Sequence, residues 1–503
     1  MRSYSPKFSV KLVKRIARKN GQSERFNSSR RVIDLADFLG DGTTVTIDKS
    51  IRNPVGAFTI TLLGKPDTTI SGVQDTLYGL IEPLDYIEIR AARSPHLYHD
   101  RADIKASPAG QRLPIIMRGF IRSVRRAELM DNTGKPQRRL VITGMDYGMI
   151  PQIYQMFLRA DYVEFTGVNY VDEFRLFART GLFSDTQTPK GFMGSCLKLL
   201  NAWLQRMVAI SGIDSEVPSS ITGDFTVTDG QVPQFSMQPI EGTVWSLMQT
   251  WCDAPWNELF FEDREAGPAL VYRPSPYVDL NGQSIFGVPV PRSIDTTDPK
   301  KPPLVLTDRD VITSDLVRSD EDVANYYWVE TTPSFPSVDL INVESMATGS
   351  LIVESANCDP RLYGLRRMNP RSMFVQGLAF SPGPLRELSD AEETKSKFDS
   401  WLLKRRDQAK RMNVDNVVYE NGTFELKGNE QVRPGTFIDV KRGRIQSSYY
   451  VTAVRHSIMP LSSFKTSVSV ERGTGFLKRI ALGSQPAPYL AENPRGVYGP
   501  PDQ

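Results

Sequence analysis

The sequence predicts an α+β, mainly β protein with two tube-like antiparallel β-barrel domains and a mixed helical and β domain between them. Three short runs near the end of the chain alternate bulky or β-branched residues with polar ones, as strands with one buried face do. A similar trio of runs occurs near the front, which indicates an internal duplication of one small antiparallel unit. The 36 Gly and 35 Pro residues suit a strand-rich chain with many turns better than a helical bundle.

The two trios follow one plan: a turn and a strand, then an aromatic-rich strand, then a third strand. The earlier trio comprises residues 83–89, 117–124 and 138–146, and the later trio comprises residues 434–440, 449–456 and 464–473. A weaker fourth correspondence relates 51–53, Val55 and 58–61 to 317–319, Val323 and 326–329, in the same order. We interpret all of these runs as strands and turns of two related barrels.

The length of the chain, 503 residues, exceeds what one hydrophobic core usually supports, so several domains are expected. The predicted parts are a basic N-terminal arm (1–31), a first barrel domain (32–150), a mixed α/β domain (151–303), a second barrel domain (304–475) with a helix at about 389–412, and a Pro-rich C-terminal tail (476–503). Periodicity predicts further helices at 193–208 and 240–252 and a hairpin at 258–274. A second hairpin is expected with 420–422 as its turn, between 417–419 and 423–426.

The charge, the cysteines and the apolar runs exclude several kinds of protein. The formal net charge of +3 is near neutral for this length and does not by itself imply a polyanionic partner. Cys196, Cys252 and Cys358 are far apart and unpaired in pattern, as buried, reduced cysteines of a cytosolic chain are. No apolar run approaches the length of a membrane span, and the basic N-terminus lacks the apolar core of a signal peptide. Sec export is therefore not expected.

No motif marks an active site. The one histidine cluster is His96 and His99 beside Asp100, which could bind a metal, but a polar loop with two exposed histidines is the preferred interpretation. His456 lies in a predicted strand and is interpreted as structural. Motifs of serine hydrolases, zinc proteases, phosphate-binding loops and dinucleotide-binding folds are missing from the sequence. We therefore predict no catalytic, cofactor-binding or metal-binding residues, no cofactor and no enzymatic activity.

The runs that carry a resemblance to a known family are spread over most of residues 32–475. They are 54–61, 117–121, 259–264 with 270–274, 323–329, 433–437, 449–456 and 470–473. Through this pattern of strands and turns, the chain resembles the baseplate (tail) hub proteins of contractile-tailed bacteriophages, the late-control-protein-D-like group. In that family two barrel domains per subunit, in a homotrimer, make a ring of six similar barrels that joins the hexameric tail tube to the trimeric cell-puncturing spike.

The resemblance implies a structural protein of the virion tail, assembled in the host cytoplasm. Its implied partners are two further copies of the chain, the tail tube protein, the spike or puncturing protein, and baseplate wedge and tape-measure proteins. Genomic DNA would pass through the lumen during ejection. No β-helical needle and no lysozyme or peptidase insert is evident, so spike and cell-wall digestion are expected to belong to other chains.

Two other functions compete with this prediction. A tail-associated cell-wall hydrolase would carry its site in residues 151–300 and would need paired acids or a nucleophile with its base. A nucleic-acid-binding protein would act through the basic arm, in which ten Lys and Arg side chains face the single acid Glu24. For the arm, a solvated segment that becomes ordered on assembly is an equally good interpretation.

Overall fold

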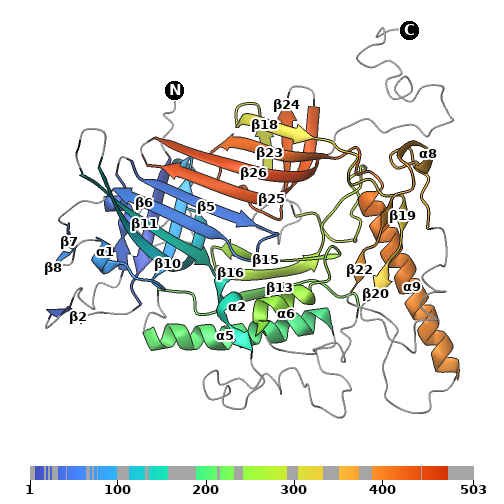
Figure 1. The fold of residues 1–503 in the computed structure, drawn as a ribbon, viewed down its shortest axis with the longest axis horizontal. Helices are drawn as coiled ribbons and strands as arrows, with labels where there is room; N and C mark the ends of the chain where they lie inside the picture. The colour runs from blue at the N-terminus through green and yellow to red at the C-terminus, as the bar shows by residue number, and fades with distance from the viewer. Residues whose placement is uncertain are drawn as a thin grey trace, which may run out of the picture.

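The structure is a computed structural model in which a large curled sheet is flanked by a few helices (Figure 1). It describes residues 6–15, 19–20, 23–24, 32–40, 42–63, 68–70, 73–75, 77–98, 113–130, 134, 136–156, 188–211, 216–230, 242–291, 304–331, 351–372, 388–442, 445–460 and 462–473. The prediction of a mainly β chain is confirmed. The predicted tail at 476–503 and the histidine His99 lie outside the described residues.

One sheet of 13 strands contains both of the regions in which barrels are predicted. Eleven strands follow the order β18-β23-β26-β25-β5-β6-β11-β10-β9-β1-β4, while β24 pairs with β25 and β17 pairs with β24. Their bounds are β1 Lys7–Val13, β4 Val32–Asp34, β5 Thr44–Ser50, β6 Ala57–Leu63, β9 Tyr86–Ala92, β10 Ile115–Met130, β11 Pro136–Asp146, β17 Leu304–Thr307, β18 Val311–Val317, β23 Glu420–Lys427, β24 Phe437–Arg442, β25 Ile445–Met459 and β26 Ser463–Gly473. Instead of two separate barrels, the described strands thus form one continuous sheet, joined where β25 pairs with β5.

The strands form where the sequence alternates, because alternate side chains of a strand point to opposite faces. In β6 the residues Phe58, Ile60 and Leu62 are buried, while the threonines between them are half exposed. β26 repeats this pattern, with Phe464, Thr466, Val468 and Val470 buried. The predicted strands at 58–61 and 464–473 are therefore confirmed, and their buried faces supply much of the core of the sheet.

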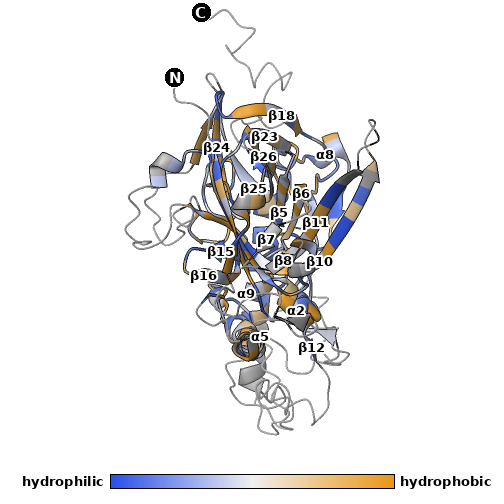
Figure 2. Cartoon of the chain, turned by 90° about the vertical axis from the view of Figure 1, so that its left-hand side faces the viewer, coloured by the Kyte–Doolittle hydropathy of each residue, from blue (hydrophilic) through white to orange (hydrophobic). Residues whose placement is uncertain are grey.

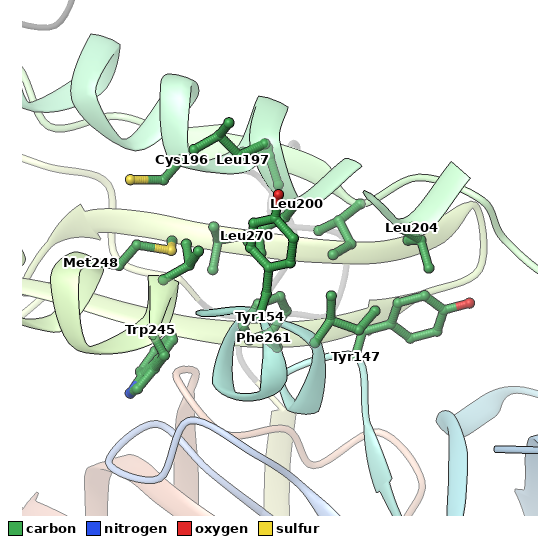
Figure 3. Packing of buried hydrophobic residues seen from close by; sticks show 14 of the residues in the cluster. Tyr147, Tyr154, Cys196, Leu197, Leu200, Leu204, Trp245, Met248, Phe261 and Leu270 are labelled. Carbon is green, nitrogen blue, oxygen red and sulfur yellow. The ribbon is translucent and has the colours of Figure 1, made fainter. Parts of the chain in front are cut away.

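A second layer packs against the sheet below its middle (Figure 1). It contains α2 (Met149–Ile153), α5 (Pro189–Ser211), α6 (Val244–Thr250), β13 (Thr222–Phe225), and the hairpin of β15 (Asn257–Arg264) and β16 (Gly267–Pro274). Figure 3 shows side chains of α5, such as Leu200, facing Leu270 of β16 and Phe261 of β15. Because this cluster also includes Tyr86 and Phe120 of the sheet, the layer shares its core with the first predicted barrel region.

A second helical segment lies within the last region of the chain, between β18 and β23. It contains α8 (Pro360–Tyr363), α9 (Leu388–Asn413), and the short strands β19 (Tyr326–Tyr327), β20 (Glu330–Thr331), β21 (Arg367–Met368) and β22 (Arg371–Ser372). Phe398, Trp401 and Leu402 of α9 are buried in a cluster of their own with Trp256. The helix predicted at 389–412 is confirmed, and helical structure is thus not confined to the middle of the chain.

The remaining described elements are short. They are η1 (Leu35–Phe38), α1 (Leu77–Leu80), η2 (Pro95–Tyr98), β2 (Lys19–Asn20), β3 (Ser23–Glu24), β7 (Thr68–Ile70), β8 (Val73–Asp75), β12 (Gln155–Met156) and β14 (Gly242–Thr243). The predicted helices at 193–208 and 240–252 correspond to α5 and α6, and the predicted hairpin at 258–274 corresponds to β15 and β16. Among the helices that the structure describes, none is both long and apolar enough to cross a bilayer.

Two local predictions are wrong, and part of the predicted arm forms a strand. Residues 326–329 are not a strand of the large sheet, because β19 pairs with β21 in a separate two-stranded sheet. Residues 417–419 do not form a hairpin with 423–426, because 420–427 is one strand, β23, that pairs with β18 and β26. Part of the predicted arm belongs to the sheet, since β1 pairs with β9 along its whole length.

Candidate assembly surface

The two ends of the large sheet contain the same order of strands. In the first half, strands lie in the order β5-β6-β11-β10-β9, and in the second half they lie in the order β18-β23-β26-β25-β24. In each half, the third, fourth and fifth strands of this order are the trio of strands found in the sequence. Along the chain the same three strands occur in the opposite order, from the fifth to the third. We call β5, β6, β9, β10 and β11 the first unit, and β18, β23, β24, β25 and β26 the second unit.

The register within the two units also agrees. In the first unit the pairing of β10 with β11 shifts between Ile121 and Ser123, and in the second unit the pairing of β25 with β26 shifts between Val451 and Ala453. In both units the residue that precedes the bulge is aromatic and lies opposite an aromatic residue of the fifth strand. Phe120 is opposite Tyr86 of β9, and Tyr450 is opposite Phe437 of β24. A β-bulge at one and the same place fixes the correspondence residue by residue, with Ile121 matching Val451.

The turn that leads into the fifth strand is built alike in both units. The backbone N–H of Leu84 donates to the Ile121 carbonyl at 2.6 Å, and that of Gly435 donates to the Val451 carbonyl at 2.8 Å. Both residues have a left-handed backbone, with φ of 68° at Leu84 and 79° at Gly435. Glycine adopts this conformation without steric cost, whereas leucine does not.

The first and second units are joined edge to edge. The first strand of the first unit, β5, pairs antiparallel with the last part of β25, from Ala453 opposite Ser50 to Ile458 opposite Val45. The Arg455 guanidinium lies 3.5 Å from the Asp48 carboxylate across this junction, and both side chains are exposed. On the other face, Ile47, Val45 and Ile458 belong to one buried cluster. This junction shows how one unit binds the next through strand pairing.

A buried imidazole lies in the same junction. His456 of β25 is opposite Ile47 of β5, and its Nδ1 lies 3.0 Å from the Thr466 hydroxyl. Burial lowers the pKa of His456 to about 3, and the charges of Arg433 and Lys49 act in the same direction. The imidazole is therefore neutral at ordinary pH, which agrees with its interpretation as a structural residue.

Below the junction, the hairpin of β15 and β16 binds the first unit through buried charges. The Lys49 ammonium of β5 contacts the Asp263 carboxylate and lies 3.6 Å from that of Asp146. Burial raises the pKa of Asp146 to about 7, because the attraction of Lys49 only partly offsets the cost of a buried charge and Asp263 opposes it. The Arg118 guanidinium of β10 contacts the Arg264 carbonyl and donates to the Glu265 carbonyl at 2.9 Å.

The same hairpin binds the second unit through another buried set. The Tyr450 hydroxyl of β25 donates to Glu258 at 2.6 Å, and the Arg273 guanidinium lies 3.1 Å from the same carboxylate. Burial raises the pKa of Glu258, while the charge of Arg273 lowers it. Arg273 also donates to the Gly435 carbonyl at 2.5 Å. The hairpin is thus tied to both units, so the two are held in one fixed arrangement.

In the described sheet β4, β17 and β18 each have an outer edge with no strand beside it. Two unpaired edges correspond to the edges of β5 and β25 that are joined to each other. One is the outer edge of β18, at one end of the strand order. The other is the part of β10 after Ile121, because β9 pairs only with Ile115 to Phe120. Figure 2 shows the ends of β10 and β11 projecting from the molecule with alternating hydrophilic and hydrophobic residues. Unpaired edges of this kind are sites at which another chain can add a strand.

Several carboxylates of the region in which a hydrolase would carry its site are bound to basic side chains. Glu258 and Asp263 have the partners given above, and Arg264 lies 2.7 Å from both Asp224 and Glu262. Within the described ranges, no group of three His, Cys, Asp or Glu side chains could hold a metal ion. Cys196, Cys252 and Cys358 are free and buried, as predicted. Sequence reasoning missed the edges of β10 and β18, because strand pairing between distant segments leaves no local pattern.

No family model matches the sequence, and no curated protein matches it. The tail protein from Neisseria meningitidis MC58 is 13% identical at a TM-score of 0.45, and the similarity covers 93% of this chain and 97% of that protein. The 43 kDa tail protein of prophage MuSo2 from Shewanella oneidensis is 11% identical at a TM-score of 0.44, with 93% and 98% covered. A component of the E. coli type VI secretion system is 8% identical at a TM-score of 0.33, with 87% and 74% covered. Two of these three solved structures are thus tail proteins, and the third is a secretion-system component.

Proposed function

We propose that the chain is a structural hub of a phage tail baseplate, in which three copies form a ring of six similar units around a DNA channel. The ring would join a six-fold tail tube to a three-fold spike. The observation that carries this proposal is the agreement of the first and second units in strand order, bulge and turn. We infer from it that the chain contains an internal duplication.

A duplicated chain solves a problem of symmetry. A ring of three identical subunits presents three equal faces, whereas a six-fold tube requires six. Two similar units in each subunit supply the missing three faces. The rigid connection between the units supports this role, because β25 belongs to the second unit and pairs directly with β5 of the first. The six units could then keep equal spacing without a flexible linker.

The described contacts favour a structural role over the two competing functions. In the region 151–300, Glu258 and Asp263 bind arginine, lysine and tyrosine side chains that hold elements together, which is not the arrangement of a free acid pair. In the predicted arm, the Lys11 ammonium lies 2.5 Å from Glu216 and that of Lys14 lies 2.5 Å from Asp85. These two charges are neutralised within the chain and add little to DNA binding.

The mass of the protein in solution tests the proposal, together with electron microscopy of single particles. We expect a trimer, and class averages of a ring with six similar densities. Addition of tail tube protein from the same phage should produce stacks capped by this ring. A monomer at all concentrations, or a ring with a number of densities that is not six, would show that the proposal is wrong. Hydrolysis of purified peptidoglycan would instead support the enzyme hypothesis.

A further inference from the structure

The junction of β5 with β25 indicates how one copy of the chain would bind the next. In the strand order of the two units, β18 corresponds to β5, and β10 corresponds to β25. Within one chain the β5 edge and the late part of β25 are paired with each other. The corresponding edges of β18 and β10 have no strand beside them in the described sheet.

We propose that β18 of one copy pairs antiparallel with the part of β10 after Ile121 in a second copy, in the register of β5 on β25. This inference rests on the proposed function, which requires a ring, and adds to it the strands, the direction and the register of the contact. The partner is a second copy of this chain, because the receiving edge and the donated strand are both present in each copy.

The register follows from the two bulges. Because Ile121 matches Val451, Arg125 matches Arg455 and Ala127 matches Ser457. The match between β5 and β18 follows through the strands that lie between them and the bulges. In the first unit, Ile47 is opposite Phe58, and Phe58 is opposite Gly144, the partner of Ile121. In the second unit, Leu316 is opposite Gly422, and Gly422 is opposite Val470, the partner of Val451, so Leu316 matches Ile47. Transfer of the β5–β25 register then places Arg125 opposite Val317, Arg126 opposite Leu316, and Ala127 opposite Asp315.

Exposure and charge on the two edges fit this pairing. Val317 has a relative exposure of 59%, which is high for a large apolar side chain, and the proposed pairing places Arg125 directly opposite it. The exposed charged residues at and after β18 are Asp315, Arg318, Asp320, Glu321 and Asp322, of which Asp320 is already paired with Arg366. The exposed side chains of the β10–β11 hairpin include Arg122, Arg125, Arg126, Arg138 and Arg139, with Glu128 as the acid among them. One edge is therefore mainly basic and the other mainly acidic, which favours their contact.

The contact is head-to-tail, since each copy would use β18 on one side and β10 on the other. A head-to-tail contact closes into a ring when the rotation per subunit divides a full turn. Two kinds of junction would then alternate around the ring, β5 with β25 inside a chain and β18 with β10 between chains. Both of the strand edges described above would be covered by neighbouring copies.

A pair of cysteines tests the register. Directly opposite residues have Cβ atoms about 4.5–5.5 Å apart, so the double variant Ala127→Cys with Asp315→Cys should form disulfides between chains on mild oxidation. We expect covalent trimers on a non-reducing gel. The matched control is Arg126→Cys with Asp315→Cys, in which neighbouring residues of a strand point to opposite faces and should not cross-link. The three native cysteines are buried and do not interfere.

The outcomes separate this inference from the proposed function. A protein that is trimeric in solution but does not cross-link through residues 127 and 315, or whose control pair cross-links equally well, overturns the proposed interface and leaves the hub proposal intact. A protein that is monomeric at all concentrations overturns both. Mixing the two single-cysteine variants should give covalent dimers only, because each chain then carries one of the two thiols.

Charge reversal provides a second measurement that does not depend on disulfide geometry. Asp315→Arg should raise the concentration at which half of the chains are trimeric by about tenfold, because it sets like charges against the β10 edge. Combination with Arg125→Glu should restore most of that loss, while Arg125→Glu alone should also weaken the trimer. An unchanged midpoint of thermal unfolding for the dissociated chains would verify that the fold is intact. No change in assembly for either single variant would contradict the interface.

Discussion

The first and second units share a strand order but differ in what surrounds them. Between their first two strands, the first unit has the short turn 51–56, whereas the second unit has residues 318–419, including α9. The first strand of the first unit, β5, is paired on both sides, whereas β18 is paired only with β23 among the described strands. The two units therefore share the strand pairing that makes the sheet and differ in the connections between their strands.

The comparison extends to single positions at which the two units have different residues. Phe120 matches Tyr450, so only the second unit has a hydroxyl at this place, and it binds Glu258. His456 matches Arg126, so only the first unit has an exposed, charged residue there. Tyr450 and His456 both lie where the second unit contacts its neighbours, the β15–β16 hairpin and β5. The differences can be tested by giving one unit the residue of the other.

The largest effect is expected at Lys49, which is buried between Asp146 and Asp263. Lys49→Met leaves both carboxylates without their cation and should lower the free energy of unfolding by about 3–5 kcal/mol. The matching residue of the second unit is the exposed Arg318, so Arg318→Met should change it by less than about 0.5 kcal/mol. Urea unfolding of both variants measures the difference. Equal losses would mean that the two positions are not distinguished by burial.

The next largest effect is expected at Tyr450, whose matching residue in the first unit, Phe120, has no hydroxyl. Tyr450→Phe takes a hydrogen bond from the buried Glu258 carboxyl and should lower the free energy of unfolding by about 1.5–3 kcal/mol. Tyr78→Phe, at an exposed site in α1, is the control and should have almost no effect. A neutral result for Tyr450→Phe would indicate that Arg273 alone satisfies Glu258.

A pH-dependent effect is expected at His456. Its pKa is about 3 in the folded protein and about 6.5 in an unfolded chain, so the unfolded state binds more protons between these values. Stability is therefore lost as the pH falls from 6.5 toward 3, by up to about 1.4 kcal/mol per pH unit from this group. His456→Gln should remove this loss.

The measurement is the difference in unfolding free energy between wild type and His456→Gln at each pH. The raised pKa of Asp146 acts in the opposite sense, since its contribution is present at low pH and is lost as the pH rises from about 4 to about 7. It occurs in both proteins and cancels in the difference. A difference that does not vary with pH would show that His456 has the same pKa in the folded and unfolded states.

The smallest effect is expected at the shared turn. Leu84→Gly gives the first unit the residue of the second and should stabilise the protein by about 0.5–1 kcal/mol, because the left-handed backbone is strained for leucine. Gly435→Ala should be unfavourable, since its Cβ would lie 2.8 Å from Phe260 and 3.0 Å from Arg273. Thermal unfolding compares the two. Stabilisation by Gly435→Ala would contradict the conformations assigned to this turn.

The sequence predicts the individual strands and helices better than the turns and the pairing between distant strands. The trio of strands and α9 follow from alternation and helical periodicity, which are local patterns, and the structure contains them. The predicted turn at 420–422 fails because Gly422 lies inside a strand: a Cβ there would lie 2.0 Å from the Asp315 carbonyl, so glycine allows β18 to approach β23. The pairing of β1 with β9 could not be predicted, because β9 and the acids that neutralise Lys11 and Lys14 are distant in sequence.

The candidate assembly surface follows from the sequence only in part. The repeat predicts that two similar units exist, but not which edges face each other, because that depends on the pairing of β5 with β25. Arg125 and Asp315 look like ordinary surface charges in the sequence. Their proposed role emerges only when the bulges after Ile121 and Val451 fix the residue-by-residue match.

The pairing of β5 with β25 has a mechanical consequence. A pull directed along these strands loads all of their hydrogen bonds together, whereas a pull across the sheet would open them one after another. If thrust passes through the ring parallel to these strands, each subunit resists it as a single stiff plate. Sliding of one half past the other would then require the whole ladder to break at once.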